Sequence, residues 1–205
     1  MKCCRTVPDE LSSRITHAKT KERALPMNFK PKTQSFNPAV LPMEYLPRVL
    51  DASDEKHARH YLIPGKIFAA AQPFAISTIV GSGVALCLWD SEHRIGGANH
   101  FILPEGPADS VNATRYANVA NEALLQRMLD LGAQRKSLEA RIFGGSLPAV
   151  TFSSGGDCVG ERNVHVTTHF LQMNSIRLVQ SEVGGTRGRK LVFQTDDGRA
   201  WSDQL

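Results

Sequence analysis

Residues 76–90, ISTIVGSGVALCLWD, constrain the fold more than any other part of the sequence. β-branched and other apolar residues fill both ends of this segment, and Gly81 and Gly83 between them permit a tight turn. The segment therefore predicts a strand, a turn and a second strand. Residues 95–103, IGGANHFIL, predict a third strand that pairs with the second.

Helices and further strands follow this segment. Residues 114–131 repeat apolar side chains at the spacing of an amphipathic helix, and Gly132 is placed to end it. A second helix is predicted over 161–173, with strands over 138–143, 176–182, 191–195 and from 199 onward. Helices mixed with mostly hairpin-linked strands predict an α/β fold, a layered α/β/α sandwich with a mixed, largely antiparallel sheet.

Prolines gather at the N-terminal end of the chain. Six of the 11 prolines fall within the first 50 residues, and each removes a backbone donor and disfavours helix at the residue before it. We therefore expect a mostly disordered leader over residues 1–60 and one folded domain over 61–205.

The basic charge of the chain also lies in this leader. The net charge is +4 and the pI is about 9.0, but residues 1–32 alone hold eight basic and three acidic residues. The remaining 16 basic and 17 acidic residues nearly cancel. A nucleic-acid-binding domain clusters its basic residues on the folded surface, so this balance argues against a nucleic-acid partner.

The chain carries no sequence signal for a membrane. It contains no apolar run long enough for a transmembrane segment, and its first residues, MKCCRTVPDELSSR, lack the apolar stretch of a secretory signal. We therefore expect a cytoplasmic protein.

The candidate chemical groups are few. Of the four cysteines, Cys3 and Cys4 lie in the leader without metal-binding spacing, Cys87 lies inside an apolar strand where packing is the expected role, and Cys158 lies in a glycine-rich stretch. His100 is the most informative histidine, because it follows Gly96 and Gly97 in a predicted strand, and these glycines would let another part of the chain approach the backbone closely.

Pairing of the second and third strands would bring several of these groups together. His100 would approach Gly83 and the hydroxyl residues Ser77 and Thr78. Taken alone, the residues indicate an α/β domain with a glycine-rich cleft around residues 77–100 and do not specify a reaction.

Several motifs in order resemble one family, the CheD chemoreceptor glutamine deamidases. The motifs are STIVGSGVALCLWD (77–90), GGANHFILP (96–104), IFGG (142–145), GERNV (160–164) and VGGTRGRKLVFQTDDG (183–198). The resemblance spans residues 65–200 and leaves the leader without a counterpart.

The resemblance implies a cysteine-hydrolase-like fold and a thiol mechanism. A thiolate attacks the side-chain amide of a receptor glutamine, ammonia leaves, and water hydrolyses the thioester to give glutamate. His100 matches the histidine that takes the thiol proton. The hydroxyl that orients this histidine falls at Thr78 or Ser77, which strand alternation places on opposite faces. The route implies no cofactor and no metal.

The chain departs from the family at the nucleophile. Gly83 stands where the family carries its catalytic cysteine. Cys87 lies four positions along the strand, roughly 13 Å away at the rise of an extended chain, and so cannot serve a base placed for residue 83.

We therefore hold two hypotheses. The first is a receptor glutamine deamidase with impaired hydrolysis, whose partner is the cytoplasmic domain of methyl-accepting chemotaxis receptors. The second is a homologue that binds these receptors or a CheC-type phosphatase without catalysis.

Overall fold

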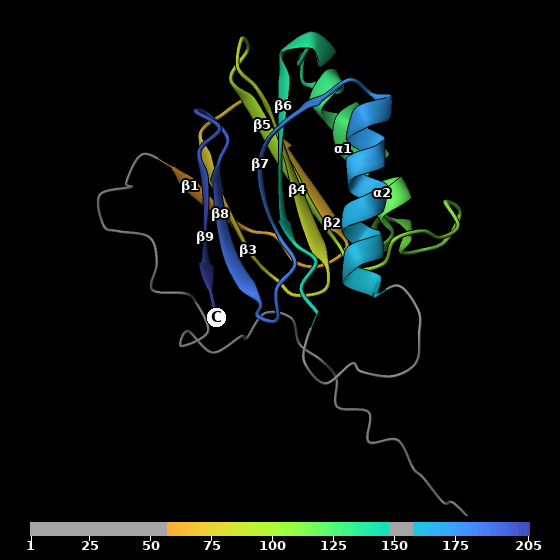
Figure 1. Cartoon of the computed structure of the whole chain (residues 1–205). Coiled ribbons are helices and arrows are strands. Elements are labelled where there is room, and N and C mark those ends of the chain that lie inside the picture. Colours follow the sequence, from red (N-terminus) through yellow and green to blue (C-terminus); the bar gives the residue numbers. More distant parts are fainter. Residues whose placement is uncertain (1–56, 148–157) are drawn as a thin grey trace, which may run out of the picture. The chain divides into compact units, whose positions relative to one another are not determined.

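A computed structural model describes residues 57–147 and 158–205 (Figure 1). The chain divides into two units, Met1–Pro47 and Arg48–Leu205, and all described residues belong to the second. Of the leader predicted over residues 1–60, the part up to residue 56 lies outside the described residues, and the last residues belong to the first strand.

The described part of the chain forms nine strands and two α-helices. The strands are β1 (Ala58–Tyr61), β2 (Lys66–Ala70), β3 (Phe74–Val80), β4 (Val84–Asp90), β5 (Ile95–Phe101), β6 (Leu138–Gly144), β7 (Arg177–Val183), β8 (Arg189–Gln194) and β9 (Ala200–Gln204). The helices are α1 (Ala117–Asp130) and α2 (Val159–Met173), with short 3₁₀ helices at η2 (Ala113–Arg115) and η3 (Arg135–Ser137). Neither α-helix is long and apolar enough to cross a membrane.

The strands form two sheets that face each other. One sheet has the order β1-β3-β8-β9 and the other the order β2-β5-β4-β6-β7. Both α-helices cover the outer face of the five-stranded sheet (Figure 1). Pairing is antiparallel throughout except between β1 and β3 and between β6 and β7.

The predicted strands and helices are present with bounds that differ by a few residues, and the mixed α/β class with largely antiparallel pairing is confirmed. The layer order differs from the predicted α/β/α sandwich, because the second outer layer is the four-stranded sheet. The reason lies in β3 and β8, whose apolar residues Ile76, Leu191 and Phe193 pack against the five-stranded sheet. This sheet therefore occupies the place that a second helical layer would take.

The protein has two hydrophobic cores, one between the two sheets and one between the five-stranded sheet and the helices. Side chains of strand β4 point alternately into one core and the other. Ala85 and Cys87 pack between the two sheets, whereas Val84, Leu86 and Leu88 pack toward the helices. Residues 81–83 join β3 of one sheet to β4 of the other. The turn that contains Gly83 therefore lies where the chain passes between the two sheets.

Candidate functional site

Thr78 and His100 form a hydrogen bond that connects the two sheets. Thr78 belongs to β3 and His100 to β5, and the Thr78 Oγ1 atom lies 2.9 Å from His100 Nδ1. Both residues are almost fully buried, at 1% and 3% exposure. The imidazole is therefore held between the sheets by a partner from the opposite sheet.

The Leu62 carbonyl fixes the direction of this hydrogen bond. Thr78 Oγ1 donates its only proton to Leu62 O at 2.7 Å. In its hydrogen bond with His100 the hydroxyl must therefore be the acceptor, so Nδ1 of the imidazole carries the proton. The other ring nitrogen, Nε2, then carries a free lone pair and can act as an acceptor or a base.

Position 83 lies directly in front of this Nε2. A Cβ atom on residue 83 would be 3.2 Å from His100 Nε2 and 3.3 Å from Ile102 Cγ2. It would also be 2.7 Å from the carbonyl oxygen of Phe101. A side chain at position 83 would thus contact the His100 imidazole.

Burial governs the acidity of His100. It lowers the pKa of the imidazole from 6.5 to about 4, against a smaller opposing effect of the Leu62 carbonyl. The ring is therefore neutral at pH 7, the protonation state in which Nε2 can take up a proton.

Backbone hydrogen bonds hold the turn at residue 83. Ser146 N donates to Gly81 O at 2.8 Å, and Gly145 N donates to Gly83 O at 2.9 Å. Sequence reasoning about the site did not identify Gly145 or Ser146, although the former belongs to the IFGG motif. The turn is thereby tied to the end of β6.

Of the two candidate hydroxyls, Thr78 meets His100 and Ser77 does not. Ser77 is half-buried, and its carbonyl accepts a hydrogen bond from Leu62 N at 2.8 Å. Alternation along β3 turns its side chain to the opposite face of the sheet. The choice that the sequence left open therefore falls on Thr78 in this geometry.

Of the cysteines, Cys3 and Cys4 lie outside the described residues, and Cys87 lies apart from His100 in the strand register. Ala85 stands opposite His100, and Cys87 stands two residues further along β4, opposite Ala98. Cys87 is completely buried between the sheets, and burial raises the pKa of its thiol to about 12. Cys158 is half-buried at the N-terminal end of α2. A thiol with a pKa of about 12 has almost no thiolate at neutral pH, so Cys87 cannot serve as the nucleophile.

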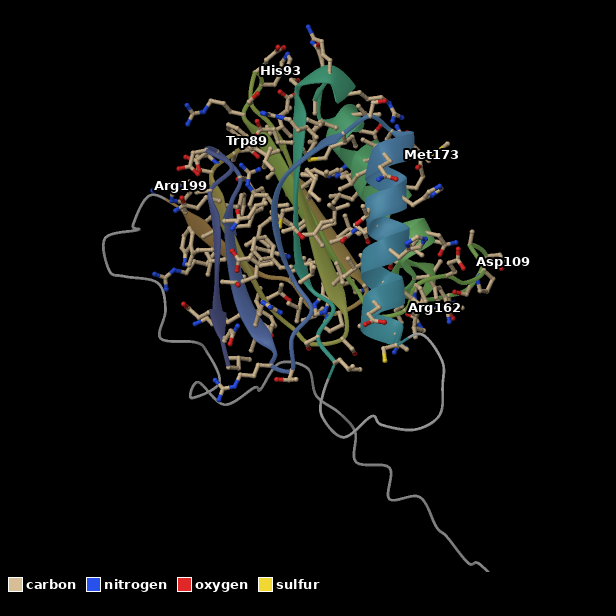
Figure 2. All side chains as sticks on the ribbon, viewed as in Figure 1. Trp89, His93, Asp109, Arg162, Met173 and Arg199 are labelled. Atoms are coloured by element: carbon tan, nitrogen blue, oxygen red, sulfur yellow. The ribbon has the colours of Figure 1, made fainter. Side chains whose placement is uncertain are left out.

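The site lies at one end of the domain. Strand β4 begins beside Gly83 and runs toward the opposite end, where Trp89 and His93 lie (Figure 2). Arg162 marks the N-terminal end of α2, which lies at the site end (Figure 2).

The chain matches one protein family. The family model described as CheD chemotactic sensory transduction matches residues 102–204. A relative from Sulfurimonas denitrificans is 37% identical over 144 residues, covering 70% of this chain and 92% of its own length. Relatives from Anaeromyxobacter dehalogenans and Rhizobium leguminosarum are 42% and 43% identical over 148 and 146 residues. They cover 72% and 69% of this chain and 85% and 77% of their own lengths.

All three relatives are named as probable chemoreceptor glutamine deamidases CheD. Among solved structures, a Neisseria meningitidis protein of the DUF152 family gives a TM-score of 0.38 at 9% identity, covering 63% of this chain and 65% of that one. On the family match and the relatives that share more than a third of their residues with it, this chain belongs to the CheD family.

Proposed function

We propose that this protein acts on glutamine side chains of chemotaxis receptors, as the names of its relatives describe, and that hydrolysis is impaired in this chain. One observation carries both parts. The Thr78–His100 pair presents a free Nε2 to residue 83, where a Cβ would lie 3.2 Å away, and residue 83 is a glycine. In this proposal His100 is the base, Thr78 orients it, and the position that would carry the nucleophile holds a glycine.

The reaction needs a thiol at this position. His100 Nε2 would take the thiol proton, and the thiolate would form a bond to the amide carbon of glutamine. The imidazolium would then donate its proton to the amide nitrogen, the carbon–nitrogen bond would break, and ammonia would leave. Water would hydrolyse the thioester to glutamate and regenerate the thiol. Without the thiol, the first bond cannot form.

Substrate binding does not depend on that bond. In a hydrolase stripped of its triad, binding and oxyanion stabilisation retain on the order of 10³ to 10⁴ in rate over water, far below full activity. We therefore expect receptor glutamines to bind near His100 with slow conversion, on the cytoplasmic domain of methyl-accepting receptors.

The contact with Phe101 favours a second candidate function. Because Phe101 O lies 2.7 Å from the Cβ position, the turn sits closer to β5 than a residue with a side chain allows. Such an arrangement suits a homologue that binds receptors, or a CheC-type phosphatase, without catalysis.

Mass spectrometry of a receptor cytoplasmic domain separates these functions. The native chain, Gly83→Cys and the double variant Gly83→Cys/His100→Gln are each incubated with the receptor, and conversion of each glutamine to glutamate is followed by peptide mass. Conversion by Gly83→Cys alone supports the impaired deamidase. Rapid conversion by the native chain would overturn the impairment. Receptor binding with no conversion by any of the three would favour the binding homologue.

A further inference from the structure

A buried amide on α2 contacts both halves of the candidate site. Asn163 is completely buried at the interface between α2 and the five-stranded sheet. Its neighbour Arg162 is exposed at the same end of the helix (Figure 2). We propose that Asn163 is a positioning residue, which sets the distance between residue 83 and the His100 imidazole.

The hydrogen bonds of this amide determine its orientation. Asn163 Nδ2 donates to Ser82 O at 2.9 Å and to Ile102 O at 3.2 Å. Both partners are carbonyl oxygens, which only accept, so the nitrogen and not the oxygen must face them. Each proton of the amide group is therefore used once.

The two carbonyls belong to the two segments that must meet for catalysis. Ser82 directly precedes residue 83, and Ile102 follows His100 by two residues at the end of β5. One side chain thus fastens the turn of the missing nucleophile to the strand of the base. A shift of either segment would lengthen one of these hydrogen bonds.

Asn163 completes the set of bonds that fix the turn. The carbonyls of Gly81 and Gly83 accept from the backbone of Ser146 and Gly145, as described above. The carbonyl of Ser82, between them, accepts from Asn163. Three consecutive carbonyls are therefore held, and only the middle one depends on a side chain.

The other end of the amide shows that packing alone does not explain this residue. Asn163 Oδ1 is buried and has no hydrogen-bond partner among the described residues. An unpaired buried acceptor is unfavourable, and an aliphatic side chain of similar size would avoid it. The two bonds from Nδ2 are what an aliphatic side chain could not supply.

The first experiment uses the native chain with Gly83 in place. Asn163→Leu removes both donors and keeps the branching of the side chain, and Asn163→Ala is a smaller second variant in case the larger methyl groups of leucine prevent folding. Thr167→Val is the control, because Thr167 is equally buried one turn along α2 and its replacement removes a hydrogen bond to the Asn163 backbone carbonyl while leaving the Asn163 amide side chain in place. Amide hydrogen exchange at Gly145 and Ser146 and the ring resonances of His100 are the readouts.

We expect hydrogen exchange at both amides to become about tenfold faster in the Asn163 variants than in Thr167→Val. This factor corresponds to the net free energy of one lost hydrogen bond. We also expect the His100 ring resonances to shift only in the Asn163 variants. Exchange rates and resonances that match those of Thr167→Val would overturn the proposal, because Asn163 would then act only through stability.

The second experiment rests on the proposed function and adds Gly83→Cys to each chain. Alkylation of the introduced thiol is followed against pH by peptide mass mapping, since a nearby imidazole sets the thiolate fraction. We expect the pH midpoint of thiol alkylation to rise with Asn163→Leu and to stay unchanged with Thr167→Val. Asn163→Gln, which keeps the two donors, should bring the midpoint part of the way back. An unchanged midpoint overturns the positioning role. A shifted midpoint without receptor deamidation by Gly83→Cys would overturn the proposed function and leave the positioning role supported.

Discussion

The carbonyl oxygen of Phe101 lies 2.7 Å from the point that a Cβ atom on Gly83 would occupy. A side chain in that place could rotate away, but a carbonyl inside strand β5 cannot move without its neighbours. Any other residue at position 83 must therefore displace the turn or the end of the strand. Glycine at position 83 therefore fits the local packing of the backbone, which leaves no room for a side chain.

Gly83→Ala should accordingly destabilise the protein. We expect a loss of about 1–3 kcal/mol in the free energy of unfolding, the range for an overpacked site. Urea denaturation monitored by circular dichroism measures it.

Gly81→Ala is the control in the same turn. Within the described part of the chain, a Cβ on Gly81 would meet only Ser146 Oγ, at 3.9 Å, an ordinary contact. This variant should be neutral or gain a few tenths of a kcal/mol from the reduced entropy of the unfolded chain. If both variants lost the same free energy of unfolding, the contact with Phe101 would not be the cause of the destabilisation of Gly83→Ala.

Thr78→Val should weaken the connection between the sheets. It leaves the His100 Nδ1–H and the Leu62 carbonyl without their buried partner, which costs about 1–3 kcal/mol in stability. Thr78→Ser keeps the hydroxyl and should recover much of this loss. Ser77→Ala, on the other face of β3, should change the free energy of unfolding by less than ~0.5 kcal/mol. A larger effect from Ser77→Ala than from Thr78→Val would contradict the assignment of the hydroxyl.

The depressed pKa of His100 makes stability depend on pH. Below pH 6.5 the unfolded chain binds a proton at this residue that the folded chain, with a pKa of about 4, does not. Stability therefore falls as the pH drops from 6.5 to 4, by on the order of 3 kcal/mol in total, and is unaffected by this residue above 6.5.

Urea denaturation at several pH values, in the native chain and in His100→Gln, measures this contribution. Carboxylates titrate in both chains, so the difference between the two curves isolates the histidine. The His100 ring resonances should titrate with a midpoint near 4. A midpoint near 6.5 would show that the imidazole is open to solvent.

Cys87 should not react with alkylating reagents in the folded protein. Its burial and its pKa of about 12 leave almost no thiolate at pH 8, whereas Cys158 is half-buried at the start of α2. Treatment with iodoacetamide followed by peptide mapping should label Cys158 and leave Cys87 unmodified until urea is added. Rapid labelling of Cys87 in the native state would reopen its candidacy as a replacement nucleophile.

Local patterns in the sequence predicted much of the fold. Alternating apolar residues and the turn glycines specified β3, β4 and β5, and Gly96 and Gly97 were expected to allow close approach of the backbone. In the structure a Cβ on Gly96 would lie 2.5 Å from Thr195 Cα, and one on Gly97 would lie 2.6 Å from Ala69 Cβ. Glycine in a strand permits such close approach, but which segments approach is decided by the tertiary packing.

The parts that sequence reasoning missed depend on distant pairing. The second sheet arises because β3 pairs with β8, more than a hundred residues later, and no local pattern specifies that partner. In the sequence, Asn163 is one polar residue among several on a predicted helix, and nothing marks it as different from the others. Its contact with Ser82 becomes visible only when α2 packs on the sheet.

The hydrogen bond between Thr78 and His100 has a consequence for identifying inactive relatives. Because the pair joins two sheets, it stabilises the fold whatever residue stands at position 83. The histidine and threonine are thus poor markers of a working enzyme. Across proteins of this architecture, the residue at position 83 should distinguish hydrolases from proteins that only bind. The presence of Thr78 and His100 indicates only that the two sheets pack together.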